Sequence, residues 1–354
     1  MIIFDLSNSP KQSLRMKAFK YILFLLLIII IGTAIYIAVQ PNSFEVSRTR
    51  TIKAPAPVIY SNVIDFKNWE KWSSWVEANP EMKLTYGEKT RGVGGSYSWE
   101  DKDGIGTMST IETIPNTTIT QEMQFAEFPK SDVSWEFKRT NDGATNVTWK
   151  ISGKDLPFGF KAFATFTGGM DKQIGPHYER SLEKLDSIVQ LRLKAFSINI
   201  DGITEYGGGF YMYKTTSATG TNISQIMGKQ YGEIKSYMAK NNIVANGMPF
   251  TIYNEMNTEN GNIIMSNAIP IMSKVTVENG SEILCGYIPK TKALKTTLKG
   301  NYTNLPKAWE ATMKHISENG LEMSNIKPFE IYMNDPGNFP NPADWVTEIY
   351  IPLK

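Results

Sequence analysis

The second half of the chain carries the same sequence pattern twice. Three short motifs recur in the same order, 79 to 82 residues further on: Lys214-Thr215-Thr216 as Lys295-Thr296-Thr297, Pro249–Tyr253 as Pro328–Tyr332, and Ile269-Pro270-Ile271 as Ile351-Pro352-Leu353. Between the first two motifs of each copy, apolar residues fall at helical spacing, such as Ile223 and Met227 in the first copy. The repeat therefore predicts two strand–helix–strand–strand units that pair into one pseudo-symmetric sheet.

Glu348 is an acidic residue that only one copy carries. When the copies are aligned on their Ile-Pro motifs, Glu348 corresponds to Ser266 and Tyr350 corresponds to Ala268. Packing requirements are shared by both copies, so they do not explain a charge in one of them. In an apolar surround the pKa of this carboxyl would rise, and the group would suit a cationic ligand or general acid–base chemistry. The alternative is a glutamate at the rim, exposed to water.

Residues 195–354 resemble the GyrI-like small-molecule-binding domain, the effector-binding domain of multidrug-responsive transcription regulators. The residues that carry the resemblance are Gly220–Tyr237, Pro249–Tyr253 and Trp345–Pro352. The resemblance implies a carboxylate on the last strand, at Glu348, that points into an aromatic cleft and meets cationic or amphipathic ligands. Some members hydrolyse strained small-molecule rings. The aromatic residues expected near this carboxylate are Trp345, Tyr350, Tyr253, Tyr332 and Trp309.

Residues 44–193 are predicted to form a separate α+β domain. Phe44–Ile52 alternates apolar and polar residues, which indicates a strand, and the two prolines that follow suit the first turn of a helix. From Met82 to Ile151 the chain is rich in Gly, Thr and aromatic residues, with turn signals such as Asn141-Asp142-Gly143, which indicates antiparallel hairpins. One face of a long closing helix is marked by Ile174, Tyr178, Leu182, Leu185 and Val189.

This order of elements resembles the helix-grip fold of the SRPBCC superfamily, also called START-like or polyketide-cyclase-like. The resemblance rests on Ile52–Tyr60, on Asp65–Trp75 and on the closing helix. It implies a cavity between the sheet and the long helix that holds an apolar ligand. The tryptophans expected to line this cavity are Trp72, Trp75 and Trp99; the alternative is that they form ordinary core, since one aromatic side chain buries roughly 150–250 Å².

An uncharged segment of 19 residues, Tyr21–Val39, precedes both domains. As a helix it would span roughly 28 Å, close to the hydrocarbon thickness of a bilayer. A cleaved signal peptide would have a shorter apolar run, and a buried core helix would rarely be apolar on every face. We therefore predict a cytoplasmic tail over residues 1–20, a single membrane span over residues 21–40, and soluble domains on the periplasmic side of the cytoplasmic membrane.

Composition argues against several classes of function. Lys and Arg number 37 and Asp and Glu 35, which leaves a net charge of +2 and no basic excess for nucleic acid. A single cysteine, Cys285, and two histidines are too few for a Cys-rich or His-rich metal centre. We also find no phosphate-binding glycine loop and no Gly-x-Ser-x-Gly elbow. We therefore expect no metal, no cofactor and no nucleic-acid partner.

These observations predict a membrane-anchored protein with two pockets that senses, sequesters or transfers amphipathic or cationic small molecules. Two alternatives remain open. The first is a hydrolase of small electrophilic compounds, in which Glu348 is the general base and Tyr332 or Tyr350 orients the substrate. The second is a scaffold whose pockets have closed.

Overall fold

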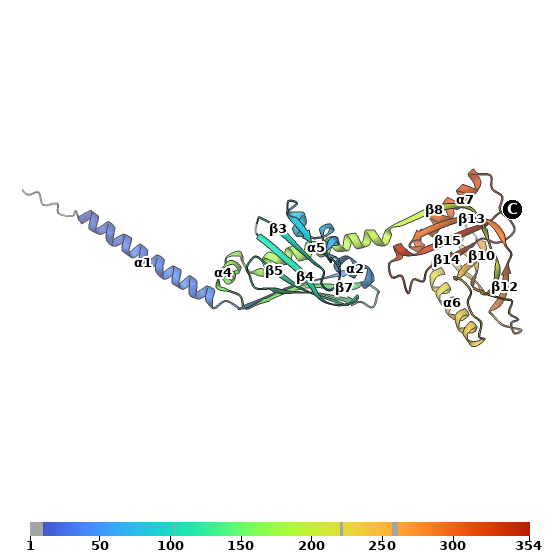
Figure 1. Cartoon of the computed structure of the whole chain (residues 1–354), viewed down its shortest axis with the longest axis horizontal. Helices are drawn as coiled ribbons and strands as arrows, with labels where there is room; N and C mark the ends of the chain where they lie inside the picture. The colour runs from blue at the N-terminus through green and yellow to red at the C-terminus, as the bar shows by residue number, and fades with distance from the viewer. Residues whose placement is uncertain (1–9, 103, 220–221, 257–260) are drawn as a thin grey trace, which may run out of the picture. The chain divides into compact units, whose positions relative to one another are not determined.

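The computed structural model describes residues 10–102, 104–219, 222–256 and 261–354 (Figure 1). The first nine residues of the predicted tail lie outside this part of the chain, as do Gly220 and Thr221 of the GyrI-like match. The chain divides into two compact units, residues 1–188 and 189–354. Each unit is mixed α+β and built around one antiparallel sheet, as the sequence predicts.

The chain begins with a long apolar helix, α1 (Pro10–Ala38). Its segment Lys17–Ala38 is long and apolar enough to cross a membrane, since 22 residues correspond to about 33 Å. The side chains of this segment are mostly exposed, from Phe19 to Val39, whereas Ile37 is buried. An apolar helix that is not covered by protein is typical of a membrane anchor and not of a core helix.

The first unit contains a seven-stranded sheet in the order β1-β7-β6-β5-β4-β3-β2. Its strands are β1 (Ser43–Ile52), β2 (Lys83–Tyr86), β3 (Ser96–Asp101), β4 (Gly104–Ile114), β5 (Thr118–Phe125), β6 (Ser131–Arg139) and β7 (Thr145–Lys154). Its helices after α1 are α2 (Ala56–Val63), the 3-10 helix η1 (Phe66–Lys71), α3 (Ser74–Ala78), α4 (Phe158–Thr167) and α5 (Met170–Lys194). Apart from the return from β1 to β7, each strand pairs with its neighbour in the chain, which explains the many hairpin signals.

Helix α5 closes this unit by packing its apolar stripe against the sheet (Figure 1). Leu182, Leu185 and Val189 are almost completely buried, at the spacing that the sequence predicts. The ring of Tyr178 stacks on Trp149 of β7 with 3.8 Å between the ring centroids. The long helix and the curved sheet are therefore held together by an aromatic and aliphatic core.

The second unit contains an eight-stranded sheet in the order β12-β9-β11-β10-β14-β15-β13-β8. Its strands are β8 (Phe196–Tyr206), β9 (Gly209–Thr219), β10 (Phe250–Met256), β11 (Asn262–Ile271), β12 (Leu284–Ile288), β13 (Thr291–Gly300), β14 (Phe329–Tyr332) and β15 (Val346–Pro352). Its helices are α6 (Ile223–Lys240) and α7 (Leu305–Glu318), with short 3-10 helices η2 (Tyr302–Asn304) and η3 (Pro342–Asp344).

This strand order confirms the predicted duplication. The order reads the same from both edges, because β9-α6-β10-β11 of the first copy corresponds to β13-α7-β14-β15 of the second. The strand before each copy pairs with the other copy's half of the sheet, β8 with β13 and β12 with β9. The copies meet at the central pair, β10 and β14, which are antiparallel.

Candidate functional site

Glu330 lies on the central strand β14 and, among the described acidic residues of the second unit, is the most deeply buried, with 1% of its surface exposed. Three neutral groups donate hydrogen bonds to its carboxylate. The Tyr253 and Tyr332 hydroxyls donate to Oε2 at 2.8 and 2.9 Å, and the Trp309 indole N–H donates to Oε1. Strand β10, strand β14 and helix α7 thus each supply one aromatic donor to the same carboxylate.

Burial governs the titration of Glu330. Loss of hydration raises the pKa of this carboxyl above its usual value, and the hydrogen bonds from Trp309, Tyr253 and Tyr332 offset only part of that effect. Within the described residues, no Lys, Arg or His forms an ion pair with it. Glu330 is therefore a buried acid that is solvated by neutral donors and lacks a counter-charge.

A chain of buried polar side chains continues from Glu330 across the sheet. The Tyr332 hydroxyl also lies 3.2 Å from Thr251 Oγ1, and Thr251 Oγ1 donates to Asn267 Oδ1 at 2.8 Å. Asn267 in turn donates to Gln230 of α6 at 2.6 Å. Since Thr251 and Asn267 are fully buried, these groups satisfy one another inside the domain and fix their side-chain orientations.

Glu330 and Thr251 occupy equivalent positions in the two copies. Pro249-Phe250-Thr251 aligns with Pro328-Phe329-Glu330, and the two residues are also paired directly across β10 and β14. The flanking backbone bonds obey the same symmetry, because Tyr253 N–H donates to Pro328 and Tyr332 N–H donates to Pro249. The pseudo-twofold axis of the domain therefore passes between a threonine and a glutamate.

The repeat itself contains a sequence signal for Glu330. The Pro-Phe motif of the repeat shows an acid in one copy, Glu330, opposite a threonine in the other, Thr251. That asymmetry is of the same kind as the one between Glu348 and Ser266. Two glutamates, Glu330 and Glu348, therefore stand where the other copy has an uncharged residue, and of these two only Glu330 is fully buried.

Glu348, the carboxylate expected in the aromatic cleft, lies on the opposite face of the sheet. In the pairing of β14 with β15, Glu348 is opposite Ile331, whereas Glu330 is opposite Ile349. The Glu348 side chain is 15% exposed, forms an ion pair with Lys295 at 2.6 Å, and accepts a hydrogen bond from Tyr350 at 2.9 Å. Glu348 therefore has a counter-charge in Lys295, and the rings of Tyr350, Phe329 and Tyr206 cluster on the same face. Its role in ligand binding stays a prediction.

The predicted aromatic residues divide between the two carboxylates. Tyr253, Tyr332 and Trp309 bond to Glu330, and Tyr350 bonds to Glu348. Trp345 packs against Tyr302, with 4.6 Å between their ring centroids. Tyr302 in turn packs against Tyr332, with 5.7 Å between their ring centroids, so Tyr302 and Tyr332 connect Trp345 to the Glu330 side. Of the two tyrosines suggested from the sequence to act with Glu348, Tyr332 lies on the other face of the sheet, whereas Tyr350 donates a hydrogen bond to it at 2.9 Å. A catalytic role of Glu348 with Tyr350 stays a prediction.

Family models match both units, in the order that the sequence predicts. The model described as polyketide cyclase / dehydrase and lipid transport matches residues 43–190, and the model of the GyrI-like small molecule binding domain matches residues 210–354. The chain thus carries a region that matches the polyketide cyclase model, called here the polyketide cyclase-like domain, followed by a region that matches the GyrI-like model, called here the GyrI-like domain. None of the curated proteins matches the chain.

Among solved structures, the EcmrR C-terminal domain is 20% identical to this chain, with a TM-score of 0.38, and covers 45% of this chain and 98% of its own. EcmrR in complex with DNA is 21% identical, with a TM-score of 0.39, and the match covers 55% of this chain and 78% of that one. Protein CV1439 from Chromobacterium violaceum is 18% identical, with a TM-score of 0.32, over 42% of this chain and 97% of that one.

In the polyketide cyclase-like domain, the three tryptophans expected to line a cavity have different surroundings. Trp72 is fully buried and packs against Trp69, Trp135 and Trp149. Trp75 is half-buried and stacks on His177 at 4.8 Å. Trp99 is also half-buried and lies flat over Gly106, where a Cβ atom would overlap its ring.

Trp72 therefore belongs to an aromatic core, as the alternative interpretation holds. His177 Nδ1 lies 2.9 Å from Ser74 Oγ, the His177 ring stacks on Trp75, and burial lowers the pKa of this imidazole. The indole N–H groups of Trp72 and Trp149 are buried without a hydrogen-bond partner. A ligand in the core of this domain stays a prediction.

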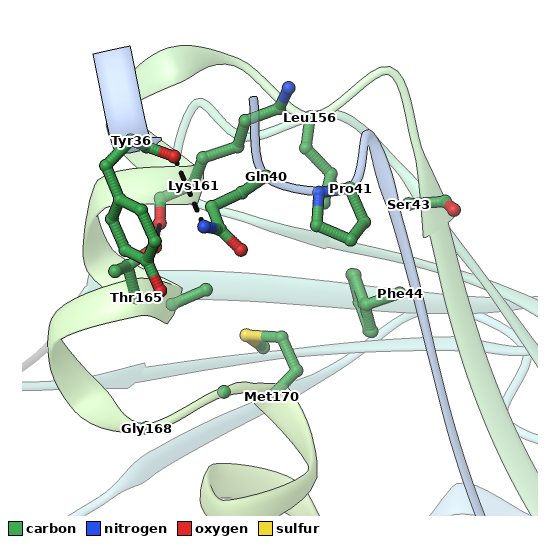
Figure 2. Close-up of a pocket in the computed structure, with 12 residues that line it drawn as sticks. Tyr36, Gln40, Pro41, Ser43, Phe44, Leu156, Lys161, Thr165, Gly168 and Met170 are labelled. Atoms are coloured by element: carbon green, nitrogen blue, oxygen red, sulfur yellow. Dashed lines mark hydrogen bonds between the residues drawn. The ribbon is translucent and has the colours of Figure 1, made fainter. Parts of the chain in front are cut away.

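Two surface hollows lie away from Glu330. One, of about 340 Å³, is lined by Tyr36, Gln40, Phe44, Lys161, Thr165 and Met170, where α1 meets α4 (Figure 2). The other, of about 250 Å³, belongs to the GyrI-like domain and is lined by residues that include Tyr206, Tyr211, Phe250 and Met272. Within the described ranges, no cluster of three or more His, Cys, Asp or Glu side chains is arranged to hold a metal ion.

Proposed function

We propose that the GyrI-like domain binds a small cationic or amphipathic molecule and that the Glu330 carboxylate meets its positive charge. The observation that supports this proposal is a buried acid whose donors are all neutral. An ionised carboxylate loses much of its hydration on burial, and neutral donors restore only part of that free energy. A cationic ligand would supply the missing counter-charge, so its binding would be coupled to ionisation of Glu330.

The aromatic donors suit the same ligand. Tyr253, Tyr332 and Trp309 each present an apolar ring as well as a polar edge, and aromatic faces attract organic cations. Tyr253 and Tyr332 are buried, whereas Trp309 is half-buried on the surface helix α7. We therefore propose that a ligand enters by displacing the indole of Trp309, which would also disrupt its hydrogen bond to Glu330.

The test titrates tetraphenylphosphonium, a bulky organic cation, into the full chain in detergent and measures binding by calorimetry. We expect saturable binding that Glu330→Gln weakens by at least about tenfold, which is about 1.4 kcal/mol. Glu348→Gln is the matched control and should bind as the unmodified protein does. Triphenylphosphine oxide has a similar shape but no charge, so its affinity should be the same for the unmodified protein and for Glu330→Gln. Equal affinity of the cation for the Glu330→Gln variant and the unmodified protein would contradict the proposal.

We also infer that α1 anchors the chain in the cytoplasmic membrane, with its amino end in the cytoplasm and both domains in the periplasm. The apolar span of Lys17–Ala38, its exposed side chains and the basic residues that precede it, such as Lys11 and Arg15, support this inference. Carbonate extraction should leave the intact chain in the membrane fraction. Protease added to sphaeroplasts should then degrade both domains, and protection of the domains would reverse the orientation.

A further inference from the structure

Helix α4 of the polyketide cyclase-like domain exposes three phenylalanines on one side. Phe158, Phe163 and Phe166 are 51%, 48% and 72% exposed. They lie within an arc of about 140° on the helix, because successive residues are about 100° apart. The fourth phenylalanine, Phe160, points the other way and stacks on Phe44 at 5.6 Å. Three exposed phenylalanines in ten residues form an apolar surface that the domain itself does not cover.

The composition of α4 suits a lipid surface. Its sequence, Phe158–Thr167, contains no acidic residue and one cation, Lys161. The remaining residues are phenylalanine, alanine, glycine and threonine. Interfacial helices combine an apolar face with basic side chains that reach the headgroups.

The position of α4 relative to the apolar span is given by direct contacts. Lys161 Nζ donates to the carbonyl oxygen of Ala38, the last residue of α1, at 3.4 Å. Ile37 is buried, and Thr33 and Ala34, one turn earlier on the same side of α1, are half-buried. The side chain of Tyr36 lies beside Lys161 and Thr165 in the hollow between the two helices (Figure 2).

These contacts place α4 against the last turn and a half of the membrane span. Five residue steps, from Thr33 to Ala38, correspond to about 7.5 Å along the helix axis. Helices that lie in the membrane interface bury their apolar face about 5–10 Å below the headgroup boundary. If α1 spans the bilayer to its end, the α4 contact lies at that depth.

From this geometry we propose that α4 is an interfacial helix, whose Phe158, Phe163 and Phe166 insert into the bilayer surface beside α1. The occupant of this apolar face is thus lipid, and the polyketide cyclase-like domain is seated on the membrane instead of being tethered above it. This inference rests on the proposed membrane anchor.

The test uses the full chain, with Cys285→Ser as background, in phosphatidylcholine vesicles. Single nitroxide labels are attached at Phe163→Cys and Phe166→Cys, and the collision rates with oxygen, which favours lipid, and with a nickel chelate, which favours water, are compared. Leu27→Cys in the middle of α1 reports on the anchor. Ile114→Cys is the matched aqueous control. Ile114 is 53% exposed and lies on β4 of the seven-stranded sheet, at the end opposite Ser43, where the chain leaves α1.

We expect the labels at 163 and 166 to behave like that at 27, with high oxygen and low nickel access, and the label at 114 to show the reverse. Nickel access at 163 and 166 as high as at 114, with 27 in lipid, would overturn the inference and leave the anchor intact. Shielding of 163 and 166 from both reagents would indicate a protein partner and would also overturn it. A water-exposed label at 27 would refute the anchor itself, and the inference with it.

Discussion

Glu330 and Thr251 face each other across the two central strands, at equivalent positions of a duplicated unit. The Tyr332 hydroxyl connects them, since it lies 2.9 Å from the Glu330 carboxylate and 3.2 Å from the Thr251 hydroxyl. A symmetric pair of glutamates at this place would put two like charges in one buried site. With threonine on one side, a single charge and its hydrogen-bonding partner share the axis of the domain.

Because the pKa of Glu330 is raised by burial, stability should fall as pH rises. The folded protein binds the proton more tightly than the unfolded chain, whose carboxyl keeps its usual value of 4.5. The contribution of protonated Glu330 to the free energy of unfolding is fully present below pH 4.5, and it is lost as pH rises through the higher pKa of the folded state. In urea unfolding, the free-energy difference between the unmodified protein and Glu330→Gln should decrease with pH. A difference that is constant from pH 4 to 8 would show that Glu330 does not titrate in this way.

Tyr253→Phe should remove one donor from Glu330 and raise the pKa of this carboxyl further, because the lost bond stabilises the ionised form more than the neutral form. We expect a loss of stability of about 0.5–1.5 kcal/mol, larger above the titration midpoint than below it. Tyr231→Phe is the control, because the Tyr231 hydroxyl bonds to Phe250 and Thr251 and not to Glu330. Tyr231→Phe should lower stability without moving the pH midpoint of the Glu330 titration. If both variants move that midpoint equally, the cause would be a general loosening of the core.

Lys295→Met should leave the mostly buried Glu348 carboxylate without its counter-charge. We expect a loss of about 1–3 kcal/mol in urea unfolding, part of which is recovered when Glu348→Gln is added. Lys299→Met, on the same strand, is the control, because Lys299 is 57% exposed and 4.0 Å from Asp344. Its effect should stay within about 0.5 kcal/mol. Similar losses for the two lysine variants would mean that the Lys295 pair has no special role.

Trp149→Ala should be severely destabilising in the polyketide cyclase-like domain, by about 3–5 kcal/mol. Trp149 is 1% exposed, and its ring stacks between Trp135 at 4.3 Å and Tyr178 at 3.8 Å. Trp149→Phe keeps an aromatic ring and removes an indole N–H that has no hydrogen-bond partner, so it should lose less stability than Trp149→Ala. Thermal melting of the full chain measures both variants. A mild Trp149→Ala would show that the aromatic core can close over the cavity.

The secondary-structure elements and their repetition could be predicted from local sequence patterns. Copies of one unit must bury the same apolar positions, so the motifs around Pro249 and Pro328 recur, and the palindromic strand order follows from their pairing. The apolar span and the two family resemblances were equally local, because each depends on residues that are close together in the chain. These features could be recognised without knowing any contact between distant residues.

Which carboxylate accepts hydrogen bonds from the aromatic donors depends on contacts between residues that are distant in the chain. Side chains of a strand alternate between faces, so strand pairing and the helix that covers each face decide what a residue meets. Glu330 faces Trp309 of α7, whereas Glu348, opposite Ile331 on the next strand, faces away from that helix toward Lys295. Both glutamates break the repeat in the same way, and only three-dimensional packing gives one a cation and leaves the other without.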